Sequence, residues 1–185
     1  AINKFKNTNN KFDLSECYML LAKSNNKLLK KEQALDYTNT SLAINYEIDN
    51  NSKIIEALIL KSYLLLDSKP IVAKNQAEET LGLINLETSN EIKADLYKLL
   101  YLCYKSNNQS GKALSMIEKH TVYKDSFQLE KNKILIVKET IKSEYENKLQ
   151  ESKAINEKES AIVRLTYTYR IYFILSLTIL LVILF

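Results

Sequence analysis

The chain alternates stretches of helically spaced apolar residues with short polar breaks, and it ends in a continuous apolar run. Leucine, isoleucine, alanine and tyrosine recur three or four residues apart, which predicts helices over about 13–29, 34–44, 53–66, 70–84, 90–104 and 113–122. Side-chain acceptors in 13–16, 49–52 and 88–91 can cap three of these helices, and Pro70 suits a first helical turn. The short connections predict that successive helices form three antiparallel pairs over 13–124.

The final run predicts a membrane span. From Ile171 to Phe185 no residue is charged, and the hydroxyls of Ser176 and Thr178 can bond back to the helix. A crossing needs about 20 apolar residues, so the predicted span covers 167–185. The expected interface residues are tyrosines and flanking arginines, namely Arg164, Tyr167, Tyr169, Arg170 and Tyr172. A buried core helix is the alternative, although the run is longer than such a helix needs.

Residues 125–166 predict a helical stalk. Asp125 can cap a new helix, and no glycine or proline follows before Arg170, so one helix of about 46 residues, or about 69 Å, can reach the span. An apolar stripe follows its first half, at Ile134, Val137, Ile141, Tyr145 and Leu149. The spacing of this stripe drifts and then weakens, which indicates a short or interrupted coiled coil. A homodimer through stalk and span is therefore a further expectation.

The two ends indicate a piece of a longer protein. The chain starts on Ala1 rather than methionine, and it stops inside the apolar run at Phe185. Residues 1–12 are polar and lack apolar periodicity, so we interpret them as a linker or as the end of an upstream repeat.

Composition narrows the fold and the function. Only 2 Gly and 1 Pro are available for turns, so the chain is expected to be all-α. Lys+Arg 26 against Asp+Glu 22 gives a net charge of +4, but the lysines are scattered, which argues against a nucleic-acid surface. Cys17 and Cys103 match no metal spacing and are expected to be small buried side chains.

No motif points to catalysis. The sequence holds one histidine and no tryptophan, and it lacks a glycine-rich phosphate loop and paired metal ligands. His120 lies within a predicted helix, and we interpret it as a partly buried helix residue. We therefore expect no enzyme activity, no cofactor and no bound metal.

The helix pairs resemble tetratricopeptide repeats. The pairs repeat about every 40 residues. In the first pair, the large Tyr18 and Leu21 and the small Ala22 lie in the first helix, and the second helix contributes the runs 34–37 and 41–44. Tyr97, Leu100, Tyr104 and Ala113 repeat part of this pattern. Small residues let paired helices cross closely. Two departures stand out, because Leu29 replaces the usual turn glycine and Lys61 falls at or beside a core position. An irregular helical bundle remains the alternative fold.

The order of these parts resembles bacterial signalling proteins of the Bacteroidetes type. The resemblance rests on residues 117–127 (IEKHTVYKDSF) and 142–150 (KSEYENKLQ), which are followed by the span. It implies that repeats, a helical linker and one transmembrane helix precede a histidine kinase or a helix-turn-helix DNA-binding output domain. This chain would then be the input module, which binds a protein or peptide and passes the signal through the stalk. A tail-anchored docking adaptor with no output domain is the alternative.

Partner binding is expected on the concave face built from the first helix of each pair. The repeat register places six polar side chains there, namely Glu16, Lys23, Asn26, Asp95, Lys98 and Lys105. The family resemblance implies that the repeats lie in the periplasm of a single-pass inner-membrane protein. Lys153, Lys158, Arg164 and Arg170 favour the opposite orientation, since positive charge near a span favours the cytoplasmic side. We follow the resemblance and predict periplasmic repeats.

Overall fold

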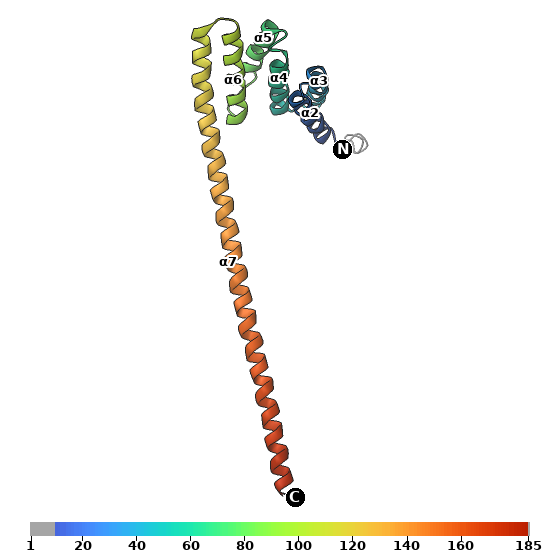
Figure 1. The fold of residues 1–185 in the computed structure, drawn as a ribbon, viewed down its shortest axis with the longest axis vertical. Helices are drawn as coiled ribbons and strands as arrows, with labels where there is room; N and C mark the ends of the chain where they lie inside the picture. The colour runs from blue at the N-terminus through green and yellow to red at the C-terminus, as the bar shows by residue number, and fades with distance from the viewer. Residues whose placement is uncertain (1–9, 185) are drawn as a thin grey trace. The chain divides into compact units, whose positions relative to one another are not determined.

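A computed structural model describes residues 10–184, with side chains through residue 179. All regular structure in this part of the chain is helical (Figure 1). The helices, in chain order, are α2 (Lys11–Lys27), α3 (Lys31–Glu47), α4 (Asn51–Leu65), α5 (Pro70–Leu81), α6 (Asn90–Ser106) and α7 (Ser110–Leu184). The chain divides into two compact units, which meet in sequence between Glu130 and Lys131 within α7. The predicted all-α class is therefore confirmed.

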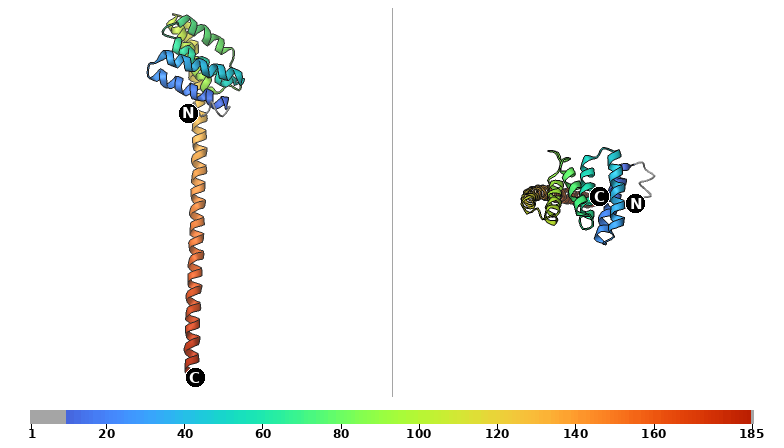
Figure 2. Two further views of the ribbon diagram at one scale, coloured as in Figure 1. Left: turned by 90° about the vertical axis from the view of Figure 1, so that its right-hand side faces the viewer. Right: turned by 90° about the horizontal axis from the view of Figure 1, so that it is seen from above.

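The first unit is a row of helices in which each packs on the next. α2 packs on α3, α3 on α4, α4 on α5 and α5 on α6, and α4 also contacts α6 (Figure 2). The first helices begin at Lys11, Asn51 and Asn90, which are 40 and 39 residues apart. The second helices begin at Lys31, Pro70 and Ser110, 39 and 40 residues apart. The predicted period of about 40 residues is thus present in the helix starts.

Side chains cap all three first helices. Asn10, Asn50 and Ser89 each precede a helix, and their side-chain oxygens accept from the backbone N–H three residues later. These bonds satisfy N–H groups that have no partner within the helix. The sequence predicted the second and third caps within 49–52 and 88–91. At the first helix it predicted Asp13 as the cap, but the helix begins earlier and Asn10 caps it by accepting from the Asp13 N–H.

Three helices end on a residue in the left-handed conformation. Leu29, Asp49 and Asn108 have φ values of 60°, 51° and 57°. After Leu29, the N–H of Lys30 donates to the Asn25 carbonyl at 2.9 Å, and the same six-residue closure follows Asp49 and Asn108. This bonding pattern turns the chain out of a helix and satisfies its last carbonyls. Leu29 therefore occupies the turn that usually holds a glycine.

Small residues allow the paired helices to approach closely. Ala34, Ala73 and Ala113 each lie at the fourth residue of a second helix and are at most 5% exposed. In the first pair the Ser41 hydroxyl of α3 donates to the Ser15 carbonyl of α2 at 3.0 Å. A larger side chain at these positions would separate the helices.

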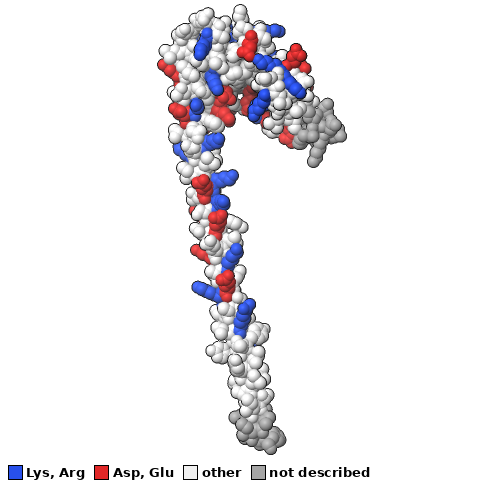
Figure 3. Space-filling model, viewed as in Figure 1, with Lys and Arg blue, Asp and Glu red and all other residues white. Residues whose placement is uncertain are grey.

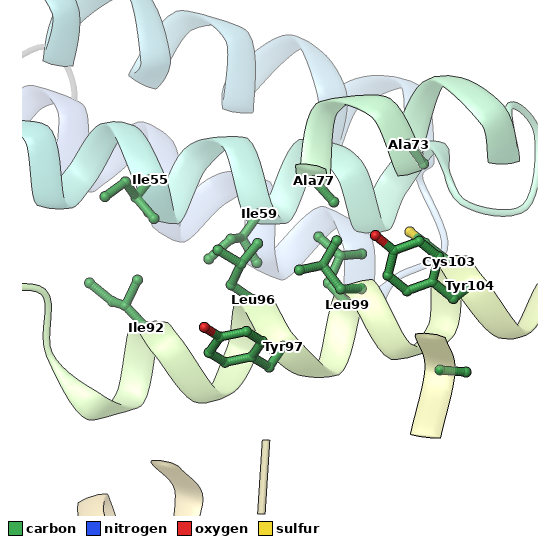
Figure 4. Close-up of a cluster of buried hydrophobic side chains, with 12 residues drawn as sticks. Ile55, Ile59, Ala73, Ala77, Ile92, Leu96, Tyr97, Leu99, Cys103 and Tyr104 are labelled. Atoms are coloured by element: carbon green, nitrogen blue, oxygen red, sulfur yellow. The ribbon is translucent and has the colours of Figure 1, made fainter. Parts of the chain in front are cut away.

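The main core lies between α4, α5 and α6. In Figure 4, Ile92 and Leu96 of α6 face Ile55 and Ile59 of α4. Ala73 and Ala77 of α5 complete the same cluster, with further members at Leu99, Leu100, Cys103, Tyr104 and Ala113. Met116 and Tyr123, from the start of α7, pack against this cluster. The first turns of α7 are therefore part of the first unit, as the second helix of the third pair.

The middle pair also follows the repeat, but one residue away from the position that the sequence suggested. Ser62 is fully buried, whereas Lys61 is only half-buried. The Ser62 hydroxyl donates to the Leu58 carbonyl at 2.9 Å and lies 3.1 Å from Gln76 Oε1 of α5. Ser62 is thus the small residue at the crossing of α4 and α5, 40 residues after Ala22 of α2.

The second unit consists of the rest of α7, in which every residue of known side-chain position is exposed. No helix begins at Asp125, because α7 continues unbroken from Ser110. The predicted stalk therefore begins inside a longer helix. Within the described residues, no helix contains a stretch both long and apolar enough to cross a membrane. Residues 180–185, the last part of the predicted span, lie outside the described side chains.

Candidate functional site

A groove of about 450 Å³ runs along the first helices of the three pairs. α2 contributes Lys23, α4 contributes most of the wall, and α6 contributes its first turns. The remaining lining residues are Ser52, Lys53, Glu56, Ile59, Leu60, Tyr63, Ser89, Glu91, Ile92 and Asp95. The groove therefore has an apolar floor of isoleucine, leucine and tyrosine between charged walls.

Lys53 connects the first pair to the second at one wall of the groove. The cap at Asn50 fixes the backbone of Lys53, and its Nζ lies 3.0 Å from Glu16 Oε1 and 3.1 Å from Glu56 Oε1. Burial opposes the charge on Lys53, but the hydrogen bonds to Glu16 and Glu56 prevail and raise its pKa. Lys53 is thus held as a cation between two carboxylates.

Asp95 of α6 also lines the groove, next to Tyr63. The Tyr63 hydroxyl donates to the Asp95 backbone carbonyl at 3.4 Å. Burial, followed by the nearby Asp95 charge, raises the pKa of Tyr63, so the phenol remains protonated and available as a donor. The side chain of Asp95 itself remains exposed.

The Asp95 carboxylate is only partly compensated by its neighbours. Loss of hydration raises its pKa, while the charges of Lys98, His120 and Lys23 act in the opposite direction. His120 reaches this region from α7, where its Nδ1 donates to the Ala94 carbonyl at 2.9 Å. The half-buried His120 therefore helps to join α6 to α7, consistent with the interpretation of it as a helix residue.

The structure brings together four of the six residues predicted for partner binding. Lys23 and Asp95 line the groove, Glu16 borders it through Lys53, and Lys98 lies close enough to influence Asp95. Asn26 lies in an adjoining hollow of about 340 Å³, which it shares with Lys23.

Lys105 lies elsewhere. It lines a separate hollow with Leu114 and Ile117, and its Nζ lies 5.7 Å from the centre of the Tyr101 ring. At this distance the ammonium is attracted to the ring face, so Lys105 already has an intramolecular partner.

Several groove residues could not be found from the sequence. Lys53, Glu56 and Tyr63 all belong to α4, the helix that fitted no single repeat register. Ser89 and Glu91 were recognised only as part of a helix cap, and nothing in their local pattern indicated a groove. If the repeat alignment had used Ser62 rather than Lys61 as the buried position, it would have placed Lys53, Glu56 and Tyr63 on the face of α4 that lines the groove.

The groove combines charged side chains with a few apolar ones. It carries two lysines, Lys23 and Lys53, and three carboxylates, Glu56, Glu91 and Asp95, and Leu60 lines it together with the edges of the buried Ile59 and Ile92. Among the described residues, no group of three or more His, Cys, Asp or Glu side chains is placed to hold a metal ion.

The predicted interface residues all lie on the second unit. Arg164, Tyr167, Tyr169, Arg170 and Tyr172 are exposed side chains of α7. On the face shown in Figure 3, acidic and basic side chains alternate along much of this part of α7, and neither sign is visible on the stretch just before the atoms drawn in grey.

Comparison with known proteins gives no assignment, since neither a protein-family model nor a curated protein matches this chain.

Proposed function

We propose that the chain is a membrane-tethered interaction module that binds a protein or peptide in the groove of its first unit. The observation that carries this proposal is the groove itself, which α2, α4 and α6 build from the corresponding helix of each pair. Repeated helix pairs present such extended surfaces to partners. The tetratricopeptide-like arrangement of the pairs is part of the proposal and is supported by their period and by the buried Ala34, Ala73 and Ala113.

The groove chemistry favours a segment with both apolar and charged side chains. An apolar side chain can lie over Leu60 and Tyr63, while a basic side chain can meet Asp95 and Glu91. Lys23 offers a partner to an acidic side chain at the α2 end. Charges of both signs give orientation and specificity to a bound peptide more than they give affinity.

The membrane tether is proposed from the sequence. The uncharged run from Ile171 to Phe185 and the tyrosines before it support residues 167–185 as the anchor. We further propose that the module belongs to a signalling protein and that the repeats face the periplasm, with an output domain beyond the span. The resemblance of 117–127 and 142–150 to such proteins supports this assignment.

Photo-crosslinking tests the binding proposal. A photoreactive amino acid replaces exposed Glu91 at the groove, and a matched probe replaces exposed Asn39 on α3, which does not line it. In cells that express the protein naturally, a defined adduct from position 91 and none from position 39 is expected. Equal adducts from both positions, or none from position 91, would remove the groove as the binding surface.

Thiol labelling tests the orientation. A cysteine replaces exposed Ser152 in a chain without Cys17 and Cys103. If the repeats are periplasmic, an impermeant thiol reagent modifies this cysteine once the outer membrane is permeable. Labelling only after lysis of the inner membrane would place the repeats in the cytoplasm.

A further inference from the structure

Two carboxylates of the groove have no direct partner for their charge. Glu91 and Asp95 lie four residues apart on α6, so their side chains project from the same side of the helix. Neither forms a salt bridge with any described residue, although Lys23 and Lys98 influence Asp95 at a distance. Lost hydration raises the pKa of Asp95, so its negative charge is not fully compensated. A cation from a bound segment would supply the missing charge.

The lysine of the α4 wall does not supply it. Lys53 Nζ already lies 3.0 Å from Glu16 Oε1 and 3.1 Å from Glu56 Oε1. Its charge is therefore shared between two carboxylates of its own. Lys23, the other lysine that lines the groove, is an exposed side chain of α2 and forms no salt bridge with a described residue. The groove thus carries more acidic than basic charge around Asp95.

An aromatic ring without a cation lies beside this carboxylate. Tyr63 donates its hydroxyl to the Asp95 carbonyl, and its ring lines the groove. In the third helix pair, four tyrosine rings each have a lysine ammonium 5.3 to 5.7 Å from the ring centre, namely Tyr97, Tyr101, Tyr104 and Tyr123. No described lysine lies over the Tyr63 ring in this way. A ring face next to a carboxylate attracts a cation twice over.

We propose that an arginine side chain of the bound segment anchors it in the groove, with the guanidinium against the Asp95 carboxylate and over the Tyr63 ring. Glu91 lies one turn before Asp95 and adds a second negative charge at the same place. This inference rests on the proposed function, because it names the residue by which the partner is recognised.

Arginine suits this place better than lysine does. A planar guanidinium can donate two parallel hydrogen bonds to one carboxylate while its face stacks on an aromatic ring. An ammonium is a compact and strongly hydrated point charge, so it cannot do both. Leu60 lines the groove next to these groups and offers an apolar surface to the methylene stem of an arginine. The groove therefore selects a guanidinium rather than positive charge alone.

Disulfide exchange at the groove tests the proposal without a known partner. Glu91→Cys is made in the whole chain with Cys17→Ser, and Cys103 stays in place because it is fully buried. The purified protein in nonionic detergent is equilibrated with guanidinoethanethiol, aminopropanethiol or mercaptopropanol, which are similar in length and differ in their end group. Mass spectrometry of the intact protein then gives the amount of each mixed disulfide.

Glu32→Cys on α3 is the matched control. Asp36 follows it by four residues, and both positions are exposed and do not line the groove. At position 91 we expect the guanidinium to be favoured over the hydroxyl by about tenfold and over the ammonium by about threefold. At position 32, where an exposed carboxylate acts alone, the preference over the hydroxyl should be at most about twofold.

Two further variants of the Glu91→Cys chain separate the carboxylate from the ring. Asp95→Asn should reduce the preference to its value at position 32, and Tyr63→Leu should remove the advantage of the guanidinium over the ammonium. A preference at position 91 no greater than at position 32, or one that Asp95→Asn leaves intact, would overturn the proposal. Equal amounts of the guanidinium and ammonium disulfides at position 91 would overturn it as well.

The outcome is distinguishable from a failure of the proposed function. If photo-crosslinking from position 91 captures a partner but the guanidinium preference is absent, the proposed function stands and the arginine anchor does not. In a captured partner, we expect the peptide attached to position 91 to carry an arginine within a few residues of the attachment point. A peptide without an arginine there would overturn the anchor even if the exchange experiment succeeds.

Discussion

Single residues decide how the helices of the first unit end. Leu29, Asp49 and Asn108 all adopt a left-handed backbone. Asparagine and aspartate tolerate this conformation better than other non-glycine residues do, whereas leucine is strained there by roughly 1–2 kcal/mol. The Leu29 side chain is 83% exposed, so packing does not explain its presence. The strain is compensated by the bonds from Leu29 and Lys30 back to α2.

Leu29→Gly is expected to stabilise the protein by about 1 kcal/mol, because glycine adopts this conformation without steric strain. The midpoint of unfolding in denaturant should rise. The neighbouring Leu28→Gly serves as the control, since Leu28 has an ordinary φ of −83° and glycine there only adds freedom to the unfolded chain. A midpoint that falls equally in both variants would contradict the strain at Leu29.

Burial also changes the chemistry of one thiol. Cys103 is fully buried in the main core, and burial raises its pKa to about 11, with a smaller contribution from Glu78. Cys17, by contrast, is partly accessible. A thiol-specific reagent should therefore modify Cys17 in the folded protein and reach Cys103 only when the protein unfolds.

The raised pKa of Cys103 predicts a loss of stability in alkali. The unfolded thiol ionises near pH 9.0 and the folded one near pH 11, so its contribution is complete below pH 9 and is lost between these values. The free energy of unfolding should fall over this interval by up to about 3 kcal/mol more in the native chain than in Cys103→Ala. The comparison with the variant removes the effect of the tyrosines. Parallel curves for the two proteins would show that Cys103 titrates normally.

Among the elements, the second helices show the repeat most clearly. Their fourth residues, Ala34, Ala73 and Ala113, are each buried where the helix crosses its neighbours. The pattern explains why the pairs can stack at one spacing although their other core residues differ. Ala73 contributes to the cluster that includes Ile59 and Leu99.

Ala73→Leu is expected to destabilise the protein by about 1–3 kcal/mol, because the added carbons have no space between α5 and its neighbours. Thermal unfolding of the variant should shift to lower temperature. The adjacent Val72→Leu, at a side chain that is 50% exposed, should have little effect. Equal behaviour of the two variants would mean that Ala73 does not mark a close helix crossing.

The helices themselves could be predicted from the sequence, because apolar spacing and caps are local signals. Pro70 begins α5 as expected, and α6 is capped within the predicted 88–91, at Ser89 rather than Thr88. The continuity of α7 through Asp125 could not be predicted, because an aspartate can either cap a new helix or lie within a longer one. No glycine or proline interrupts the chain there, so α7 continues through Asp125.

The candidate groove could be predicted only in part. Lys23 and Asp95 followed from the register of the first and third pairs. The groove residues of α4 could not be predicted, because periodicity alone cannot tell which of Lys61 and Ser62 is buried. A hydropathy pattern treats serine as a polar, exposed residue. Ser62 can nevertheless be buried, because its hydroxyl donates to the Leu58 carbonyl and contacts Gln76 of α5.

At the scale of the molecule, the groove depends on all three pairs. Lys23, Lys53 and Asp95 come from helices that are distant in sequence, and the repeat brings them to one face. Binding there would be coupled to the packing of α4 against α6.

The affinity of the crosslinked partner for charge-reversed chains tests the central claim most directly. Lys23→Glu combined with Asp95→Lys keeps the net charge but exchanges the signs at the two ends of the groove. Titration calorimetry with the purified partner should show an affinity reduced by about tenfold or more, since unfavourable charges would face each bound side chain. As the control, Lys30→Glu combined with Asp36→Lys makes the same exchange on exposed residues that do not line the groove, and it should bind normally. Normal binding by the Lys23→Glu and Asp95→Lys protein, confirmed as folded by circular dichroism, would contradict the assignment of the groove as the partner site.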